Sequence, residues 1–145
     1  MPKGELLSRM LVFATQWHQD QFDKSGMPYI LHPLTVMNML QTEDEELQCI
    51  ALGHDLVEDC KVTYQDLSDQ GFTKRIIEGI KAMTKIPGET KDEYKSKVKS
   101  NPDAVKVKMC DLRHNSDITR LKDLTTKSIE RTIFYHQFYT ELKDL

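Results

Sequence analysis

Apolar residues recur at helical spacing along almost the whole chain, and no convincing strand-like alternation of apolar and polar residues occurs. This pattern predicts an all-α fold. The length of 145 residues suits one domain over residues 1–145. Because 39% of the residues are apolar and 30% are charged, the composition is that of an ordinary globular protein. We therefore expect a single helical bundle with its own core.

Start and stop signals divide the chain into about seven to eight helices. Residues 90–100 are ambiguous, because this polar stretch fits either a weak amphipathic helix or an ordered loop. His32 stands directly before Pro33, which suits a helix N-cap. The other predicted helices cover approximately residues 6–22, 33–41, 43–60, a short segment after 63, 73–85, 101–119 and 127–142.

The charge balance and the cysteines exclude several classes of partner. Twenty basic against 23 acidic residues give a net charge of −3, which supplies no general attraction to a nucleic acid polymer or an anionic membrane. No apolar run is long enough to cross a bilayer, and no signal peptide is evident. The three cysteines have neither disulfide nor zinc-site spacing. These features predict a cytoplasmic chain with reduced thiols.

The predicted helix over residues 43–60 places acidic and imidazole groups on its apolar side. With His54 at zero on a helical wheel, Glu58 lies near 40° and Asp55 near 100°, at about 100° per residue. Leu47 and Ile50 fall within roughly 60° of His54. A solvated helix would separate these two kinds of residue. Since buried carboxylates need matched charge, this face predicts a bound cation.

The helix that follows Asn101-Pro102 repeats this arrangement, because Asp111 and Asn115 lie on its apolar stripe. With the histidine at the start of the second helix, the chain then offers two histidines and two aspartates for one metal ion. Nitrogen and oxygen ligands of this kind suit Mn²⁺, Fe²⁺, Zn²⁺ or Mg²⁺. Glu58 and Asp59, one turn beyond the central histidine, are candidates for handling water and leaving-group protons.

Four segments also carry a family resemblance. They are residues 18–34, which include Pro-Tyr-Ile-Leu-His-Pro; 53–59, Gly-His-Asp-Leu-Val-Glu-Asp; 83–85, Met-Thr-Lys; and 108–115, Lys-Met-Cys-Asp-Leu-Arg-His-Asn. In this order they resemble the HD-domain phosphohydrolases, and more narrowly the hydrolase domain of RelA/SpoT-type alarmone enzymes and their small free-standing relatives. The resemblance extends over about residues 6–121.

The resemblance implies a metal-dependent enzyme that removes the 3′-pyrophosphate of ppGpp or pppGpp and leaves GDP or GTP. The metal, usually Mn²⁺ in this family, would be held by His32, His54, Asp55 and Asp111. Glu58 and Asp59 would be the catalytic acids. Contacts to the nucleotide are expected from Lys24, Ser25, Lys85, Arg113 and Asn115.

Two positions depart from the long enzymes of this family. The long enzymes commonly have two basic residues before the Ser-Gly pair, whereas this chain has Asp23 and then Lys24. A side chain that could stack on the base or reach a phosphate is therefore missing. The closing motif reads Asp-Leu-Arg-His-Asn, which looks more like the small members of the family.

Two alternative functions therefore stay open. One is an HD hydrolase of another nucleotide, such as a nucleoside phosphate or an NADPH-like molecule. The other is a non-catalytic nucleotide-binding or regulatory module that keeps the metal. A monomer or a small homo-oligomer fits either.

Overall fold

The structure is a computed structural model that describes residues 2–145. The chain is helical over this range, with one isolated bridge between Phe22 and Pro28. The all-α prediction is confirmed. The elements are α1 (Glu5–Trp17), α2 (Leu31–Met39), α3 (Glu45–Gly53), α4 (Leu56–Asp59), α5 (Tyr64–Asp69), α6 (Lys74–Met83), α7 (Lys91–Lys99), α8 (Pro102–Asn115), the short 3-10 helix η1 (Ile118–Arg120) and α9 (Thr126–Lys143).

The helix expected over residues 43–60 is interrupted, which gives one helix more than the sequence predicts. α3 ends at Gly53, and α4 begins at Leu56 after a turn through His54 and Asp55. The carbonyl of Ala51 accepts a hydrogen bond of 2.6 Å from the His54 ring, so a side chain satisfies a carbonyl at the end of α3. The turn therefore forms around the central motif itself.

Several helix boundaries differ from the expected ones, and the structure resolves the one ambiguous segment. α2 begins at Leu31 with Ile30 as N-cap, so the prediction that His32 is the N-cap is wrong, and His32 lies buried in the first turn. α1 ends at Trp17, five residues earlier than expected. The ambiguous segment 90–100 is a helix, because Thr90 and Glu93 form a capping box.

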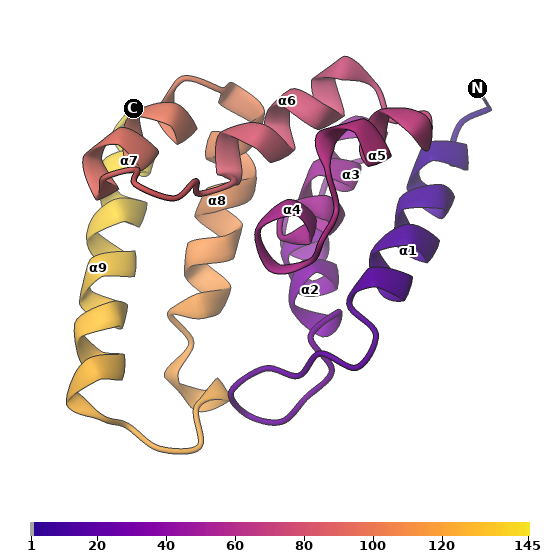
Figure 1. The fold of residues 1–145 in the computed structure, drawn as a ribbon. Coiled ribbons are helices and arrows are strands. Elements are labelled where there is room, and N and C mark those ends of the chain that lie inside the picture. The colour runs from indigo at the N-terminus through magenta and orange to yellow at the C-terminus, as the bar shows by residue number, and fades with distance from the viewer. Residues whose placement is uncertain (1) are drawn as a thin grey trace.

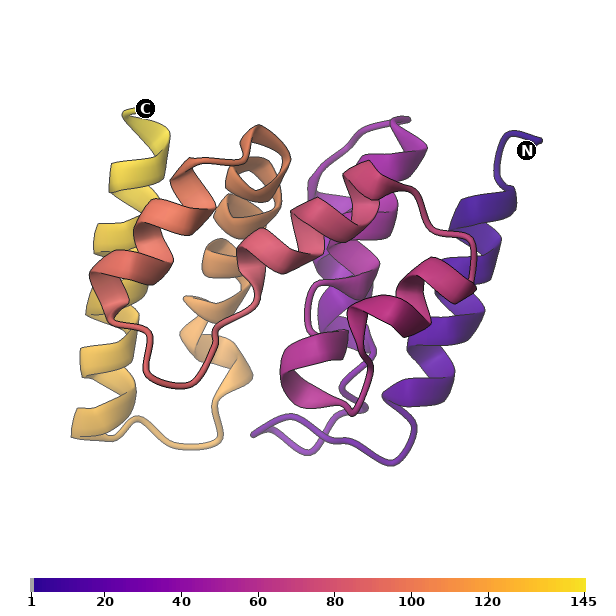
Figure 2. The ribbon, with the colours of Figure 1, turned by 45° about the horizontal axis from the view of Figure 1, so that its top comes forward.

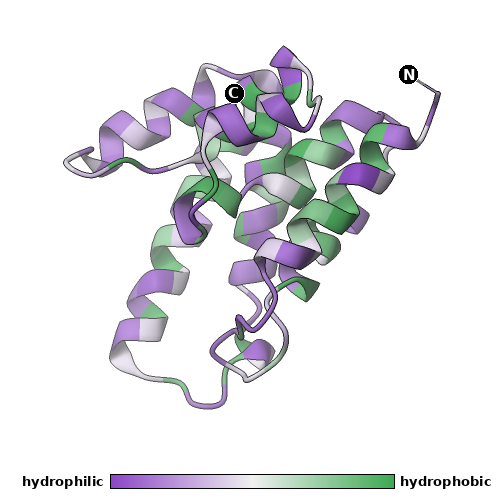
Figure 3. Ribbon diagram, turned by 45° about the vertical axis from the view of Figure 1, so that its right-hand side comes forward, coloured by the Kyte–Doolittle hydropathy of each residue, from purple (hydrophilic) through white to green (hydrophobic). Residues whose placement is uncertain are grey.

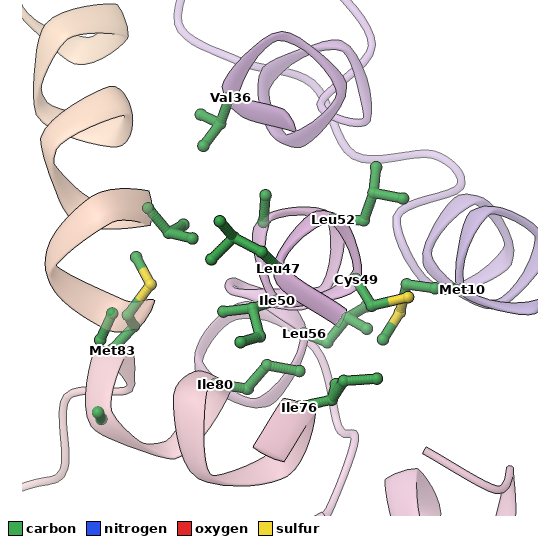
Figure 4. Close-up of a cluster of buried hydrophobic side chains, with 14 of the residues drawn as sticks. Met10, Val36, Leu47, Cys49, Ile50, Leu52, Leu56, Ile76, Ile80 and Met83 are labelled. Atoms are coloured by element: carbon green, nitrogen blue, oxygen red, sulfur yellow. The ribbon is translucent and has the colours of Figure 1, made fainter. Parts of the chain in front are cut away.

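The core surrounds α3. Figure 4 shows Ile50 of this helix next to Ile80 of α6, with Met10 of α1 and Val36 of α2 on other sides of α3. All four side chains are fully buried.

In Figure 3, α1 carries both hydrophobic and hydrophilic residues, as expected of an amphipathic helix with one side against the core. None of the helices described over residues 2–145 is both long and apolar enough to span a bilayer.

Packing of α2, α3 and α8 brings the predicted site residues together. α2 packs against both α3 and α8, while α9 lies along α8 on the opposite side of the molecule from α1 (Figure 1). The loop between α1 and α2 and the segment between α8 and α9 lie at the same end of the bundle in both ribbon views (Figure 2). The site lies between these two connections and the ends of the helices.

Candidate metal and nucleotide site

The structure brings together all four of the predicted metal ligands. His32 Nε2 lies 2.8 Å from Asp111 Oδ1, and His54 Nε2 lies 3.3 Å from the same oxygen. Asp55 Oδ2 lies 3.1 Å from the Nε2 atom of His54 and 3.8 Å from that of His32. Two imidazole nitrogens and two carboxylate oxygens therefore converge from α2, α8 and the α3–α4 turn.

The Nδ1 atoms of His32 and His54, the ring nitrogens that do not face the carboxylates, each have a hydrogen-bond partner. His54 Nδ1 donates to the carbonyl of Ala51 at 2.6 Å. His32 Nδ1 lies 2.8 Å from Nδ1 of His114, whose ring is nearly parallel to that of His32, at 11°. Partners of this kind fix the orientation and the tautomer of a ligating histidine. Both Nε2 atoms are therefore aimed at the carboxylates.

Charge within the cluster favours a cation. Burial alone would raise the pKa of Asp111, but the Lys108 ammonium at 2.9 Å and the two imidazoles hold that pKa well below its usual value. Burial would also raise the pKa of Asp55, yet His54 lowers it. Burial disfavours a charged His54, but Asp55 and Asp111 raise its pKa well above the usual value. The buried carboxylates thus stay ionised and attract positive charge.

This donor set fits a divalent metal ion. His32, His54 and Asp55 each offer a ligand atom, and these atoms lie within 4.8 Å of one another. The second oxygen of Asp111 is occupied by Lys108, while the amide of Asn115 donates to Oδ1 at 3.1 Å. Both neighbours lie on α8 and hold the carboxylate in one orientation. Two imidazoles with two carboxylates match the ligands of Mn²⁺, Fe²⁺ or Zn²⁺.

The two predicted catalytic acids lie beside this cluster on α4. Carboxylate oxygens of Asp55, Glu58 and Asp59 lie within 4.8 Å of one another. The backbone N–H of Lys85 donates to Glu58 at 2.8 Å and holds that carboxylate in place. Burial, together with the charges of Asp55 and Glu58, raises the pKa of Asp59 to about 6. Asp59 can therefore take up and release a proton near neutral pH.

Tyr29 links the metal ligands to the acids. Its hydroxyl lies 2.6 Å from Asp55 Oδ2, to which it donates, and 3.2 Å from Asp59 Oδ2. Burial and the charge of Asp55 raise the pKa of this phenol far above its usual value, so it stays protonated as a donor. Sequence reasoning placed Tyr29 in a motif but assigned it no role.

A cavity of about 260 Å³ opens beside the cluster. His32 and Asn115 line it on the metal side, and the predicted substrate residues Lys24 and Ser25 line it on the α1–α2 loop. Cations from segments far along the chain complete its walls, namely Arg120 of η1 and Arg131 of α9. An anionic ligand that reaches the metal cluster would meet positive side chains here.

Asp23 lies in the wall of this cavity, at the position where the resemblance expects a basic residue. Its Oδ1 accepts hydrogen bonds from the backbone N–H groups of Ser25 and Met27, at 2.9 and 3.0 Å, and from the Ser25 hydroxyl at 2.6 Å. Its other oxygen lies 3.5 Å from Arg120. The carboxylate therefore organises the loop and contacts a cation from η1, which also lines the cavity.

Two predicted substrate residues lie elsewhere. The Lys85 side chain extends over the ring of Tyr94, at 5.3 Å from the ring centre. Arg113 lines a different groove, together with Lys106 and Tyr139. Arg113 is two positions from Asp111, or about 200° around α8, so a helical wheel already separates the two. The structure does not bring either side chain to the cavity.

Sequence reasoning also missed residues that the site uses. Lys108 and His114 lie three positions either side of Asp111, on the same face of α8, so the helical wheel that singled out Asp111 could have found both. Arg120 and Arg131 belong to none of the four motifs. Only the path of η1 and the packing of α9 against α8 bring them to the cavity.

Comparison with known proteins gives the family. Residues 11–114 match the model of the HD domain. Similar proteins include a guanosine-3′,5′-bis(diphosphate) 3′-pyrophosphohydrolase of Vibrio cholerae (37% identical over 87 residues, 59% of this chain) and one of Aquifex aeolicus (36% over 100 residues, 68% of this chain). Another is the bifunctional (p)ppGpp synthase/hydrolase SpoT of Escherichia coli, 34% identical over 59% of this chain. The chain spans only 12%, 14% and 13% of the length of these three proteins.

A solved structure agrees with the fold over nearly the whole chain. It is that of a metazoan ortholog of SpoT, described as hydrolysing ppGpp, with a TM-score of 0.79 and 20% sequence identity. The match covers 98% of this chain and 86% of the other. At this identity the likeness concerns the fold. Together with the family model over residues 11–114, it establishes that the chain belongs to the HD-domain family, as its four motifs indicate.

Proposed function

We propose that this chain is a metal-dependent nucleotide hydrolase that removes the 3′-pyrophosphate of ppGpp or pppGpp. The convergence of His32, His54, Asp55 and Asp111 on one point, next to a cavity with cationic walls, is the observation that carries the proposal. The names of the relatives support the choice of substrate. Mn²⁺ is the ion that we expect, because the donor set suits it and the family resemblance implies it.

The position of each side chain in the site determines its role in the proposed reaction. His32, His54, Asp55 and Asp111 would hold a divalent cation, which would supply Lewis-acid polarisation of a phosphoryl oxygen. Glu58, fixed by the Lys85 amide, orients the attacking water as a hydrogen-bond acceptor. Asp59 exchanges a proton near neutral pH. Lys24 and Arg120 offset the charge of the phosphate groups in the cavity.

Further parts of the proposal come from the sequence. We propose one HD-type domain over residues 1–145, a monomer or small homo-oligomer, a cytoplasmic location and no nucleic acid polymer as partner. The net charge of −3 supports the last point. The three cysteines are free thiols, which fits a reducing compartment.

A panel of nucleotides tests the activity. Purified protein is incubated with Mn²⁺ and ppGpp, pppGpp, common nucleoside triphosphates or NADPH, and pyrophosphate and phosphate release are followed beside an Asp55→Ala control. We expect pyrophosphate from ppGpp and pppGpp only, and none from the control.

Each other outcome overturns a defined part of the proposal. Turnover of a different nucleotide would overturn the substrate, and Asp23 in the cavity wall is the feature that favours this rival. Metal binding without any turnover would overturn the enzymatic assignment in favour of a binding module.

A further inference from the structure

Phe22 is an unpartnered aromatic side chain in the wall of the nucleotide cavity. It is 64% exposed, although single exposed apolar side chains are common and do not by themselves indicate a site. Phe22 differs from the others because it lines the cavity that also contains His32. It belongs neither to the hydrophobic core nor to the side chains packed against that core. Among residues 2–145, the aromatic ring pairs do not include it.

The loop that carries Phe22 is tightly organised. Backbone hydrogen bonds join Asp23 N–H to Met27 O and Tyr29 N–H to Gln21 O, both at 2.8 Å. The Asp23 carboxylate closes the same turn from inside, and Gly26 takes the left-handed conformation that the turn requires, with φ of 86°. The ring is therefore presented by a backbone that is already ordered, so binding a ligand loses little further freedom.

The loop also joins the ring to the metal cluster. Tyr29 ends the turn, and its hydroxyl donates to the metal ligand Asp55. A nucleotide with a phosphate group at the cluster would thus have its remaining part in a cavity walled by Phe22. Asp23 cannot serve as a flat platform, because its carboxylate is engaged within the loop and with Arg120.

We propose that Phe22 stacks on the base of the bound nucleotide and so determines much of its affinity. This inference rests on the proposed function and concerns the base end of the same site. Every base offers a π-face, and base–aromatic stacking is strong enough to dominate the contacts of a base that has few hydrogen-bond partners. The ring would contribute equally to ground state and transition state, because it lies away from the reacting phosphate. Its removal should therefore change KM rather than kcat.

Kinetics of three variants test this role. For Phe22→Ala we expect KM for ppGpp to rise roughly fivefold to a hundredfold, with kcat changed less than about threefold. Phe22→Tyr should restore the wild-type KM, since it keeps the ring. Met27→Ala is the matched control, because Met27 is a 50% exposed apolar residue of the same loop that does not line the cavity. An unchanged KM in Phe22→Ala, or an equal change in Met27→Ala, would overturn the proposal.

A fluorescence measurement separates this inference from the activity. Trp17 is the single tryptophan, so a Trp17→Phe/Phe22→Trp double variant carries its only indole at position 22. Stacking predicts saturable quenching by GDP but not by inorganic pyrophosphate, whether or not the protein turns over ppGpp. Absence of turnover by the wild type would refute the proposed function alone. Absence of quenching by GDP, or equal quenching by pyrophosphate, would refute the role of Phe22.

Discussion

Among single residues, the site depends on groups that hold the proposed metal ligands as well as on those ligands themselves. Tyr29 donates to Asp55, Lys108 and Asn115 hold Asp111, and the Ala51 carbonyl fixes His54. Supports of this kind act on metal affinity, because they determine where each ligand atom points before the ion arrives.

Tyr29→Phe tests one such support without changing the shape of the ring. Removal of the hydroxyl leaves Asp55 and Asp59 without their shared donor, and we expect the affinity for Mn²⁺ to fall roughly 10- to 100-fold in a metal titration. Tyr139→Phe is the control. Tyr139 packs against the core from α9 and lines the groove that contains Arg113, which includes none of the four predicted metal ligands, so the change should leave metal affinity unaltered. Equal metal affinity in Tyr29→Phe and the wild type would contradict this role.

Asp59 should make the stability of the metal-free protein depend on pH. The folded carboxyl has its pKa raised from 3.8 to about 6, so between these values the folded state keeps a proton that the unfolded state releases. The contribution of Asp59 to the free energy of unfolding therefore falls as the pH rises through this window. Asp59→Asn removes that dependence. Thermal melts from pH 4 to 7 should show the variant gaining stability relative to the wild type, and a constant or falling difference would contradict the raised pKa.

At the scale of elements, the segment between α6 and α7 places Glu58. Lys97 of α7 donates to the Thr84 carbonyl at 2.6 Å and pairs with Glu89 at 2.9 Å. Glu89 in turn accepts a hydrogen bond from Ile86 N–H, at 3.3 Å. The next amide back along this segment, that of Lys85, holds Glu58. The lysines of α7 are therefore not equivalent, because Lys97 fixes the segment that holds the proposed catalytic acid Glu58.

Lys97→Met should loosen this support. We expect turnover to fall roughly tenfold, because small displacements of a catalytic group have large effects on rate, while metal content stays at the wild-type level. Hydrogen exchange of residues 84–90 should become faster. Lys99→Met is the matched control, since within residues 2–145 Lys99 pairs only with Glu141, at 3.4 Å on the surface. If turnover and hydrogen exchange were unchanged in Lys97→Met, the position of residues 84–90 would not depend on Lys97.

Local signals in the sequence predict elements well here and long-range contacts poorly. The side chain of Asn101 caps α8, and Thr63 and Asp66 form a capping box at the start of α5, both from residues within one turn of the helix. The end of α3 at Gly53 is not predicted, because the hydrogen bond between the His54 ring and the Ala51 carbonyl leaves no signal in the pattern of apolar residues. Likewise, Arg131 reaches the cavity only through the packing of α9 on α8, for which the sequence carries no local signal.

In the molecule as a whole, α6 packs closely against α3, the helix that His54 follows directly. A Cβ added at Gly79 of α6 would lie 2.5 Å from Cδ1 and 2.9 Å from Cγ1 of Ile50, which is fully buried on α3. Glycine therefore permits the two helices to approach each other. The pattern of residues 43–60 predicts one face that is both apolar and polar, but not this spacing between helices.

Gly79→Ala should destabilise the protein by about 1–3 kcal/mol through overpacking, as measured by denaturant unfolding. Ile50→Val removes the methyl that the new Cβ would meet, and alone it should cost about 0.5–1.5 kcal/mol. We expect the double variant to be less destabilised than the sum of the two single changes, because one change makes room for the other. Additive effects would show that the two positions do not share one contact.

In our proposal, one metal ion held by four side chains makes this chain a hydrolase. The most direct measurement is metal content per chain and pyrophosphate release from ppGpp, determined in parallel for the wild type, Asp55→Ala and Glu58→Gln. We predict one ion in the wild type and in Glu58→Gln, and none in Asp55→Ala. Turnover should be lost in Asp55→Ala and slowed by roughly 10²- to 10⁴-fold in Glu58→Gln. An Asp55→Ala protein that is free of metal and fully active would contradict the account.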